Sequence, residues 1–200
     1  MFADQLVFPL RAHTSPEWAP LIVENFSEFL KDHAGAERKA HANCLAILSK
    51  YQNRTELVES MLEIATEELQ HFSEVVAMLH KRSLTLAESL VKDFYAESLL
   101  AQLRPESEAR LMDRLVVTSI IEARGCERFG LLGEELLKRG DLELGHYYQE
   151  LSRVEARHYG SYFRLAKHYA PAALVETRFE QLLDFEASLL KSLPLRPCLH

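Results

Sequence analysis

Apolar and polar positions alternate with a helical period along most of the chain. In four long stretches an apolar residue returns after four and then three positions, the repeat that is typical of helices packed nearly antiparallel in a bundle. This pattern predicts long helices over about 16–51, 55–82, 106–139 and 142–169. We also expect helical segments over 84–103 and 171–193, with an N-terminal arm (1–16) and a C-terminal tail (194–200). The fold class expected is all-α, with one domain spanning 1–200.

Several residues mark the expected helix ends. Ser15 and Thr55 are suitable N-terminal caps, and Arg104-Pro105 interrupts the helical pattern between the two halves of the chain. Gly140 suits a C-terminal cap, and Asp141 can then cap the next helix.

Each of the four apolar stripes is interrupted near its middle by a Glu, and two of these Glu are followed three positions later by a His. The residues are Glu37, Glu68 with His71, Glu122, and Glu155 with His158. Residues three apart share one helix face. Burying an ionised carboxylate without a partner costs several kcal/mol, and two divalent cations would balance four such charges.

The spacing of these residues indicates a duplicated site. Glu37 precedes Glu68 by 31 residues and Glu122 precedes Glu155 by 33, so each half is a helix, a turn and a helix. One Glu from each of two helices plus Glu-x-x-His from each of the other two is the arrangement of ferritin-like di-iron carboxylate bundles. We therefore predict a ferritin-like four-helix bundle with additional connecting and C-terminal helices. The alternative is a metal-free bundle with buried hydrogen-bonded pairs.

A third Glu-x-x-His motif, Glu143 with His146, lies at the start of the fourth long helix. No Glu stands 31 to 33 residues before Glu143, so we interpret this motif as a chance match. Carboxylate with imidazole suits iron or manganese, whereas zinc usually takes fewer ligands. Six protein ligands leave open positions on two ions, which favours chemistry with a small molecule such as dioxygen.

Neighbouring residues on the same stripes have two interpretations each. Ala40 and Gly125, one turn beyond the single Glu residues, leave space beside the metals or permit close helix packing. Tyr162 can donate a hydrogen bond into the site or serve as a core residue. His33 and His41 flank Glu37 and are expected to be outer or surface groups, with His33 a possible hydrogen-bond partner of the ligand.

Composition narrows the class of protein further. The formal net charge is −7, so global electrostatics do not indicate a nucleic-acid binder, although a local basic face remains compatible with it. The three Cys form no CxxC, which argues against a disulfide framework or a Cys-ligated metal, and we expect Cys44 and Cys126 to be packing residues. No signal peptide or apolar run long enough to span a membrane is found, so the cytoplasm is the expected location.

Four segments of the chain resemble the tRNA 2-methylthio-N6-isopentenyladenosine hydroxylases: 32–40, 67–72, 121–129 and 152–159. The most specific of them are Ile-Glu-Ala-Arg-Gly-Cys-Glu-Arg-Phe at 121–129 and Glu-Ala-Arg-His at 155–158. The resemblance implies a non-haem di-iron monooxygenase. Such an enzyme would use dioxygen and an external electron donor, a partner protein or reductase, to hydroxylate the isopentenyl chain beside the anticodon of tRNA. The family's metal ligands correspond to Glu37, Glu68, His71, Glu122, Glu155 and His158.

Two stripes of basic residues are candidates for contact with a tRNA partner. They are Arg110, Arg114, Arg124 and Arg128 on the third long helix, and Arg153, Arg157, Arg164 and Lys167 on the fourth. These residues can contact phosphates, or they can pair with surface Glu.

Other functions remain compatible with the residues. They are a rubrerythrin-like or manganese-catalase-like oxidoreductase acting on a small molecule or peroxide, a non-enzymatic iron-binding bundle, and the metal-free bundle. We expect a monomer or a small homo-oligomer.

Overall fold

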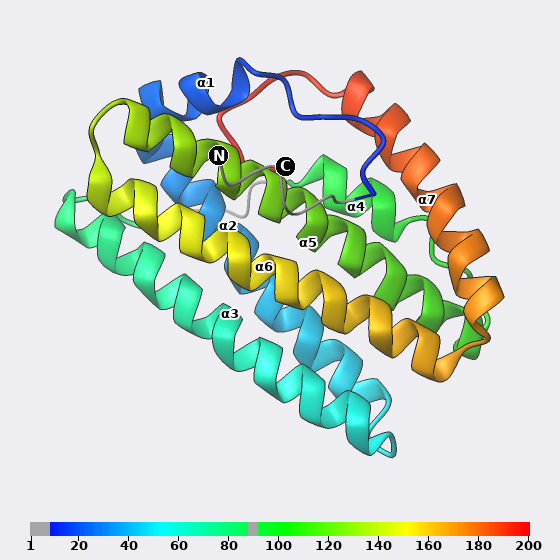
Figure 1. Ribbon diagram of the computed structural model, residues 1–200. Helices are drawn as coiled ribbons and strands as arrows, with labels where there is room; N and C mark the ends of the chain where they lie inside the picture. Colours follow the sequence, from blue (N-terminus) through cyan, green and yellow to red (C-terminus); the bar gives the residue numbers. More distant parts are fainter. Residues whose placement is uncertain (1–8, 88–91) are drawn as a thin grey trace. The chain divides into compact units, whose positions relative to one another are not determined.

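Every regular element among the residues that this computed structural model describes, 9–87 and 92–200, is a helix. The helices are α1 (Trp18–Glu24), α2 (Phe26–Lys50), α3 (Thr55–Lys81), α4 (Phe94–Leu100), α5 (Ser107–Lys138), α6 (Leu142–Tyr169) and α7 (Ala172–Ser192) (Figure 1). The all-α class is thereby confirmed. No described helix combines the length and the apolar content that crossing a membrane requires.

The four long helices lie where the apolar pattern predicts them, with two differences nearby. The first predicted helix is divided into α1 and α2 at Asn25, whose backbone is non-helical and whose carbonyl accepts from the N–H groups of Glu28 and Phe29. The segment predicted as helical over 84–103 is helical only in α4, and residues 88–91 lie outside the described residues. Of the predicted N-terminal arm, residues 9–15 carry no helix, and 1–8 lie outside the described residues.

The chain separates into two compact units. Unit 1 comprises residues up to Glu24, residues 93–196 and His200, and unit 2 comprises residues 25–92 and 197–199. Each unit contains one hairpin of two long helices, α5–α6 in unit 1 and α2–α3 in unit 2. The single domain expected over 1–200 stays a prediction.

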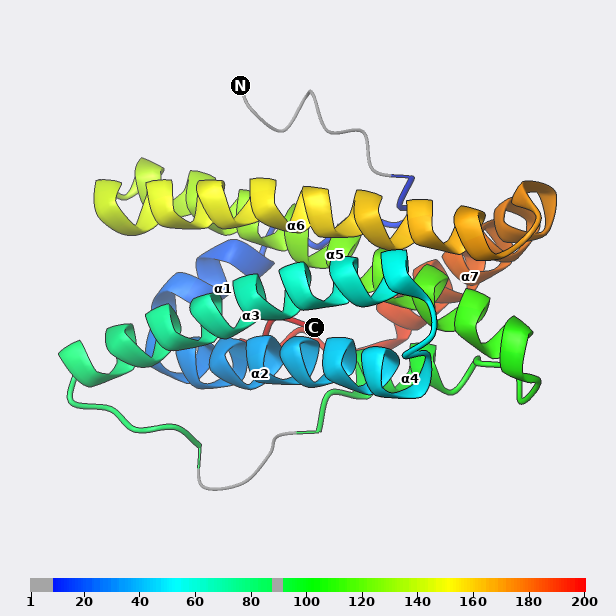
Figure 2. The ribbon, with the colours of Figure 1, turned by 90° about the horizontal axis from the view of Figure 1, so that it is seen from below.

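In unit 2, α2 and α3 lie alongside each other (Figure 2). Their apolar stripes form a cluster in which four residues are fully buried: Leu30, Ala34, Val75 and Leu79. The expected cap at Thr55 is wrong by one position, because Arg54 is the cap residue and Thr55 begins the helix. His41 on α2 lies 2.7 Å through Nδ1 from the carbonyl oxygen of Ala65 on α3, which fixes the two helices in register.

In unit 1, α5 is the central helix and contacts α1, α4, α6 and α7. The turn between α5 and α6 has the two caps that the sequence predicts, Gly140 and Asp141. Gly140 has a φ of +86°, and the N–H of Asp141 donates to the carbonyl of Leu136 at 3.0 Å, which closes the end of α5. The Asp141 carboxylate then accepts from the N–H of Leu144 at 3.1 Å and caps α6.

A glycine allows α5 and α6 to approach closely near this turn. A Cβ atom added at Gly133 would lie 2.9 Å from Cγ of Gln149 and 3.0 Å from the carbonyl oxygen of Gly145. Both distances are shorter than van der Waals contact, and the second involves backbone that cannot move without shifting α6. Gly133 is therefore required by packing, despite its low helix propensity.

A buried carboxylate ties the connection before α5 to α7. Asp113 on α5 is fully buried, and it accepts from Arg104 through the backbone N–H and Nε, both at 2.9 Å, and through Nη2 at 2.7 Å. Nε of Arg178 on α7 donates to it at 3.1 Å. Burial acts to raise the pKa of Asp113, but these hydrogen bonds and positive charges outweigh burial, so the pKa lies below its ordinary value.

We expect Gly133→Ala to lower the free energy of unfolding by about 1–3 kcal/mol, because the added methyl group overpacks the α5–α6 contact. Gly160→Ala on α6 is the control, since a Cβ there meets no atom within 4 Å. That change should raise the free energy of unfolding by up to ~1 kcal/mol through helix propensity. Chemical denaturation measures both, and a Gly133→Ala protein as stable as wild type would contradict the packing argument.

We expect Asp113→Asn to lower stability by about 2–4 kcal/mol at pH 7, because two arginines then lose a buried partner. The folded-state pKa is depressed, so the contribution of the carboxylate is fully present above the unfolded-state pKa of about 4 and is lost as pH falls through the folded value. The difference in the free energy of unfolding between wild type and Asp113→Asn should therefore become smaller below about pH 4. Denaturation curves at several pH values measure this difference, and a difference that does not change with pH would contradict the role given to the Asp113 carboxylate.

Candidate metal centre

The α2–α3 hairpin of unit 2 brings together three of the predicted ligands. One ligand atom from each of Glu37, Glu68 and His71 lies within 4.8 Å of the others. The three residues are 3%, 1% and 7% exposed. Nδ1 of His71 is 3.6 Å from Oε2 of Glu37 and 3.7 Å from Oε2 of Glu68. Two carboxylates and an imidazole thus converge on one buried point, which we call the unit 2 half-site.

His33 holds one of these carboxylates. It lies one turn before Glu37 on α2, is fully buried, and places Nε2 2.6 Å from Oε1 of Glu37. Its ring stacks on Phe29, with the centroids 5.5 Å apart. The prediction that His33 is a hydrogen-bond partner of Glu37 is confirmed, and the surface interpretation of His33 is wrong. His41 instead contacts the backbone of α3.

The α5–α6 hairpin of unit 1 brings together the other three predicted ligands. One ligand atom from each of Glu122, Glu155 and His158 lies within 4.8 Å of the others. These residues are 8%, 3% and 2% exposed. Nδ1 of His158 lies 3.0 Å from Oε2 of Glu155. This cluster, the unit 1 half-site, has the same donor set as the unit 2 half-site.

The two half-sites follow from the same local physics. In each hairpin the first helix supplies one Glu, and the second supplies Glu and His on adjacent turns of one face. Carboxylate and imidazole groups in this combination can hold iron or manganese. The third motif differs, because Glu143 and His146 are both exposed at the start of α6. Its interpretation as a chance match agrees with that exposure.

Space exists beside the unit 1 half-site. Gly125 is buried, and a Cβ added there would meet no atom within 4 Å, so close helix packing does not explain this glycine. Tyr162 is fully buried one turn beyond His158, as expected of a core residue. Ala40 is half-buried on α2.

The cysteines fit the interpretation as packing residues. The Sγ–H of Cys126 donates to the carbonyl of Ser152 at 2.9 Å, and burial raises the pKa of this thiol to about 12. Such a thiol stays protonated and unreactive at neutral pH. Cys44 is fully buried, and no disulfide joins Cys44, Cys126 and Cys198.

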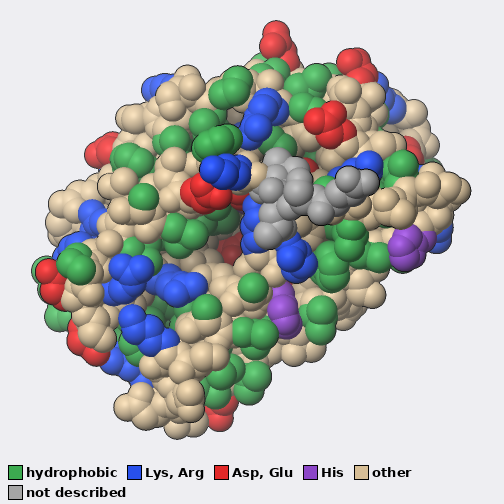
Figure 3. Space-filling view, turned by 180° about the vertical axis from the view of Figure 1, so that it is seen from behind, with side chains coloured by type: hydrophobic (Ala, Val, Ile, Leu, Met, Phe, Trp, Pro, Cys, Tyr) green, Lys and Arg blue, Asp and Glu red, His purple; other side chains and the backbone are tan. Residues whose placement is uncertain are grey.

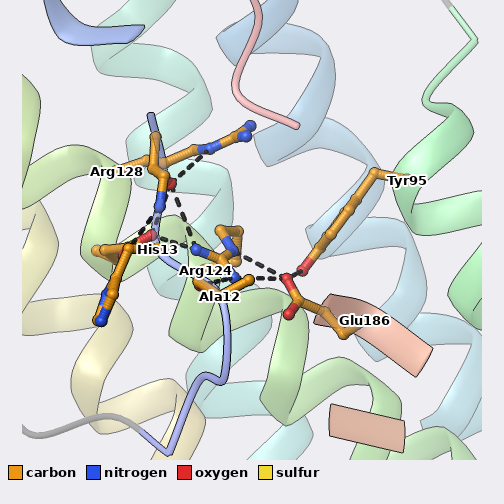
Figure 4. Close-up of polar contacts among 8 residues, drawn as sticks. Ala12, His13, Tyr95, Arg124, Arg128 and Glu186 are labelled. Atoms are coloured by element: carbon orange, nitrogen blue, oxygen red, sulfur yellow. Dashed lines mark hydrogen bonds and ion pairs between the residues drawn. The ribbon is translucent and has the colours of Figure 1, made fainter. Parts of the chain in front are cut away.

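Two arginines that the sequence placed on a candidate phosphate-binding stripe are instead buried inside unit 1. Arg124 is fully buried, and its Nη2 donates to Oε1 of Glu186 on α7 at 2.7 Å and to the carbonyl of Ala12 at 2.8 Å (Figure 4). It also pairs with Glu127. Arg128 is 7% exposed and donates through Nε to Oγ1 of Thr14 at 3.3 Å. Contact of these two side chains with phosphates is therefore ruled out as a primary role.

The same hydrogen-bond network extends to α4, and no pattern in the sequence indicates this connection. The hydroxyl of Tyr95 donates to Oε1 of Glu186 at 2.9 Å. Burial and the Glu186 charge raise the pKa of Tyr95. Burial acts to lower the pKa of Arg124, but the charges of Tyr95, Glu127 and Glu186 outweigh it and raise that pKa. Apolar residues of α5 outside its main stripe indicate that more than one face of this helix is buried, but they do not indicate that Arg124 lies inside. They are Met112, Val116, Val117, Ile120 and Ala123.

Comparison with solved structures gives a near match over the whole chain. A chain described as Protein 43 with aldehyde deformylating oxygenase activity, from Synechococcus, superposes with a TM-score of 0.89 at 33% identity. The match covers 97% of this chain and 96% of that chain. The ferritin-like fold class expected from the sequence is confirmed.

Comparison with curated proteins and family models gives one consistent answer. The tRNA 2-(methylsulfanyl)-N(6)-isopentenyladenosine(37) hydroxylase of Pseudomonas putida is 34% identical over 90% of this chain and 85% of that protein. The enzyme of the same name from Salmonella typhimurium is 33% identical over 68% of this chain and 48% of that protein. The family model described as tRNA-(MS[2]IO[6]A)-hydroxylase (MiaE) matches residues 3–200, and the chain therefore belongs to the MiaE family of hydroxylases.

Proposed function

We propose that this protein hydroxylates the isopentenyl chain of 2-methylthio-N6-isopentenyladenosine in tRNA, using a di-iron centre. The observation that carries the proposal is the conjunction of family membership with two buried half-sites of the same donor set. The six proposed ligands are Glu37, Glu68, His71, Glu122, Glu155 and His158.

The donor set supports iron. Each half-site supplies two carboxylates and one imidazole, all less than a tenth exposed. Carboxylates buried to this degree are costly to ionise unless cations meet them, and four carboxylates match the charge of two divalent ions. Two iron ions would supply the activation of dioxygen, with electrons from an external donor protein or reductase.

The residues around the ligands have separable tasks. His33 orients the Glu37 carboxylate through their 2.6 Å contact, and the stacked Phe29 ring holds His33 in place. Residues that lock a ligand in this way keep it in one geometry when the metal binds. Gly125 leaves room on α5 one turn beyond Glu122, which suits entry of an apolar chain such as an isopentenyl group. Because the proposed substrate is tRNA, we propose a cytoplasmic location. That the protein is a monomer or small homo-oligomer stays a prediction from the sequence.

A second candidate function is aldehyde deformylation. It is favoured by the likeness to the Synechococcus chain, which is described as having that activity and is 33% identical over nearly its whole length. One fold can support both activities, because function depends on the site and its access rather than on the fold. The two candidates differ in what the purified, iron-loaded protein consumes, an aldehyde or a nucleoside within tRNA.

We expect the purified protein to bind two iron ions per chain, and Glu68→Ala or Glu155→Ala to reduce this content strongly. The control is Glu143→Ala with His146→Ala, which removes the exposed Glu-x-x-His motif and should leave the iron content unchanged. Elemental analysis and the optical spectrum of the oxidised protein measure the result. A metal-free Glu68→Ala protein should be at least as stable as metal-free wild type, because a buried charge has been removed. Wild-type protein that takes up no iron would favour the metal-free alternative.

We expect expression of the protein in a strain that makes 2-methylthio-N6-isopentenyladenosine, but lacks the hydroxylase, to produce the hydroxylated nucleoside. Mass spectrometry of digested tRNA detects it as a gain of one oxygen atom. Glu155→Ala should abolish the product, and the Glu143→Ala, His146→Ala control should retain it. If iron-loaded wild type leaves the nucleoside unchanged and instead consumes an aldehyde or peroxide, the tRNA function is wrong.

A further inference from the structure

The solvent-facing stripe of α6 changes charge partway along the helix. Its exposed residues follow at spacings of three and four, so they lie in one row. The first part of the row contains Glu143, His146 and Glu150. From there to the end of the helix the row contains no acid, and its members are Arg153, Arg157, Gly160, Arg164 and Lys167. We call this second part the α6 basic row.

Among the described residues, strong internal pairing is absent at Arg164 and Lys167 of the α6 basic row, and Arg153 is paired only at the surface. Arg153 lies 2.6 Å from Glu150 and Lys167 lies 2.7 Å from Glu176, but both acids are more than half exposed. Exposed pairs of this kind contribute about 0–1 kcal/mol and exchange readily for another anion. Arg164 has no ion-pair partner within the described parts of the chain. The helix dipole favours cations in the last turn only, so it explains Lys167 but not Arg153, Arg157 and Arg164.

Aromatic rings lie beside the α6 basic row. Tyr159 and Phe163 are stacked with centroids 6.3 Å apart, and Phe163 packs on Phe179 of α7 at 4.7 Å. The Nζ atom of Lys167 lies 4.8 Å from the centroid of Phe163. Cations interleaved with partly exposed rings are the groups that bind RNA, because phosphates pair with the cations and unpaired bases stack on the rings.

The position of the row on α6 relates it to the half-site in the same unit. Glu155 and His158 are buried on α6, whereas Arg153 and Arg157 are exposed on the same turns. Lys167 lies 14 positions after Arg153, so the row is roughly 21 Å long at 1.5 Å per residue. One helix thus carries proposed metal ligands on its inner side and a continuous line of cations on its outer side.

A local basic surface is needed if this acidic protein is to bind RNA. The net charge of −7 opposes a polyanion at long range. Charges of both signs are mixed on the molecular face shown in Figure 3, where acidic side chains lie among basic ones. The α6 basic row differs from such a mixed surface, because over its length every charged residue on the exposed face is positive.

We propose that the α6 basic row binds the phosphate backbone of the anticodon arm of tRNA. This inference rests on the proposed tRNA function and assigns a surface to it. Arg164 and Lys167 are the residues to test, because they are six and nine positions beyond His158 and leave the proposed ligands untouched. Tyr159 and Phe163 would then stack with bases of the loop.

The test compares the binding of tRNA to full-length, iron-loaded protein over a range of salt concentrations. The tRNA is isolated from a hydroxylase-deficient strain, so that it carries the unhydroxylated nucleoside. Arg164→Ala with Lys167→Ala should weaken binding at least about tenfold, because two charged hydrogen bonds are lost. The slope of log K against log salt should become shallower by roughly 1.4 to 1.8 for two lost phosphate contacts.

The matched control removes the same charge from another part of unit 1. Lys138→Ala with Lys191→Ala, both exposed, should leave affinity and slope close to those of wild type. Arg164→Lys with Lys167→Arg keeps both charges and should restore the slope. Iron content and thermal unfolding of every variant show whether a loss of binding reflects a loss of structure instead.

The outcomes separate this surface from the proposed function. If wild type hydroxylates tRNA in cells, but the Arg164→Ala, Lys167→Ala protein binds tRNA with wild-type affinity and slope, the surface is wrong and the function stands. If wild type neither binds tRNA nor hydroxylates it, both are overturned. Binding to vesicles of anionic phospholipid that depends on Arg164 and Lys167, without binding to tRNA, would also overturn the surface.

Discussion

A carboxylate enclosed by an apolar helix interface costs several kcal/mol to ionise unless a cation or hydrogen-bond donors meet it. In both half-sites of this protein imidazole groups lie beside the buried carboxylates. They are His33 and His71 in one hairpin and His158 in the other. Imidazole and carboxylate are also donors that iron accepts. The same residues can therefore satisfy the buried charge in the folded chain and bind metal, which is why a folding requirement and a functional requirement coincide here.

In helix α5, buried charged residues are balanced by ion pairs with oppositely charged side chains. This helix contacts four other helices of unit 1, and its fully buried charged residues Asp113 and Arg124 are paired inside. Asp113 forms ion pairs with Arg104 and Arg178. Arg124 forms ion pairs with Glu186 and Glu127. The pairs with Arg178 and Glu186 join α5 to α7, and a hydrogen bond from Arg124 to the carbonyl of Ala12 joins it to the N-terminal arm, so these contacts fix the helix that carries Glu122.

The contrast between α5 and α6 has a consequence for RNA binding. Arg124 and Arg128 on α5 are used internally, whereas the arginines of α6 face solvent because α6 packs mainly on one side, against α5. Similar residues at similar spacings thus have different roles, set by the number of neighbours around each helix. The chain is similar both to a tRNA hydroxylase and to an aldehyde deformylating oxygenase, so the fold alone does not identify the substrate and the residues at the site and on the surface must do so.

The sequence by itself determined the four long helices, the caps at Gly140 and Asp141, and the burial of the six acidic and imidazole residues, because each depends on periodicity or on a neighbour a few positions away. Only the tertiary structure decided the break at Asn25, the short α4, and the burial of Arg124. Arg124 meets Glu186 across 62 positions of sequence, and a helical period reports which residues share a face but not what packs against that face. His33 belongs to both groups: its place on the apolar stripe made it a candidate hydrogen-bond partner of Glu37, whereas its complete burial was decided by the tertiary structure.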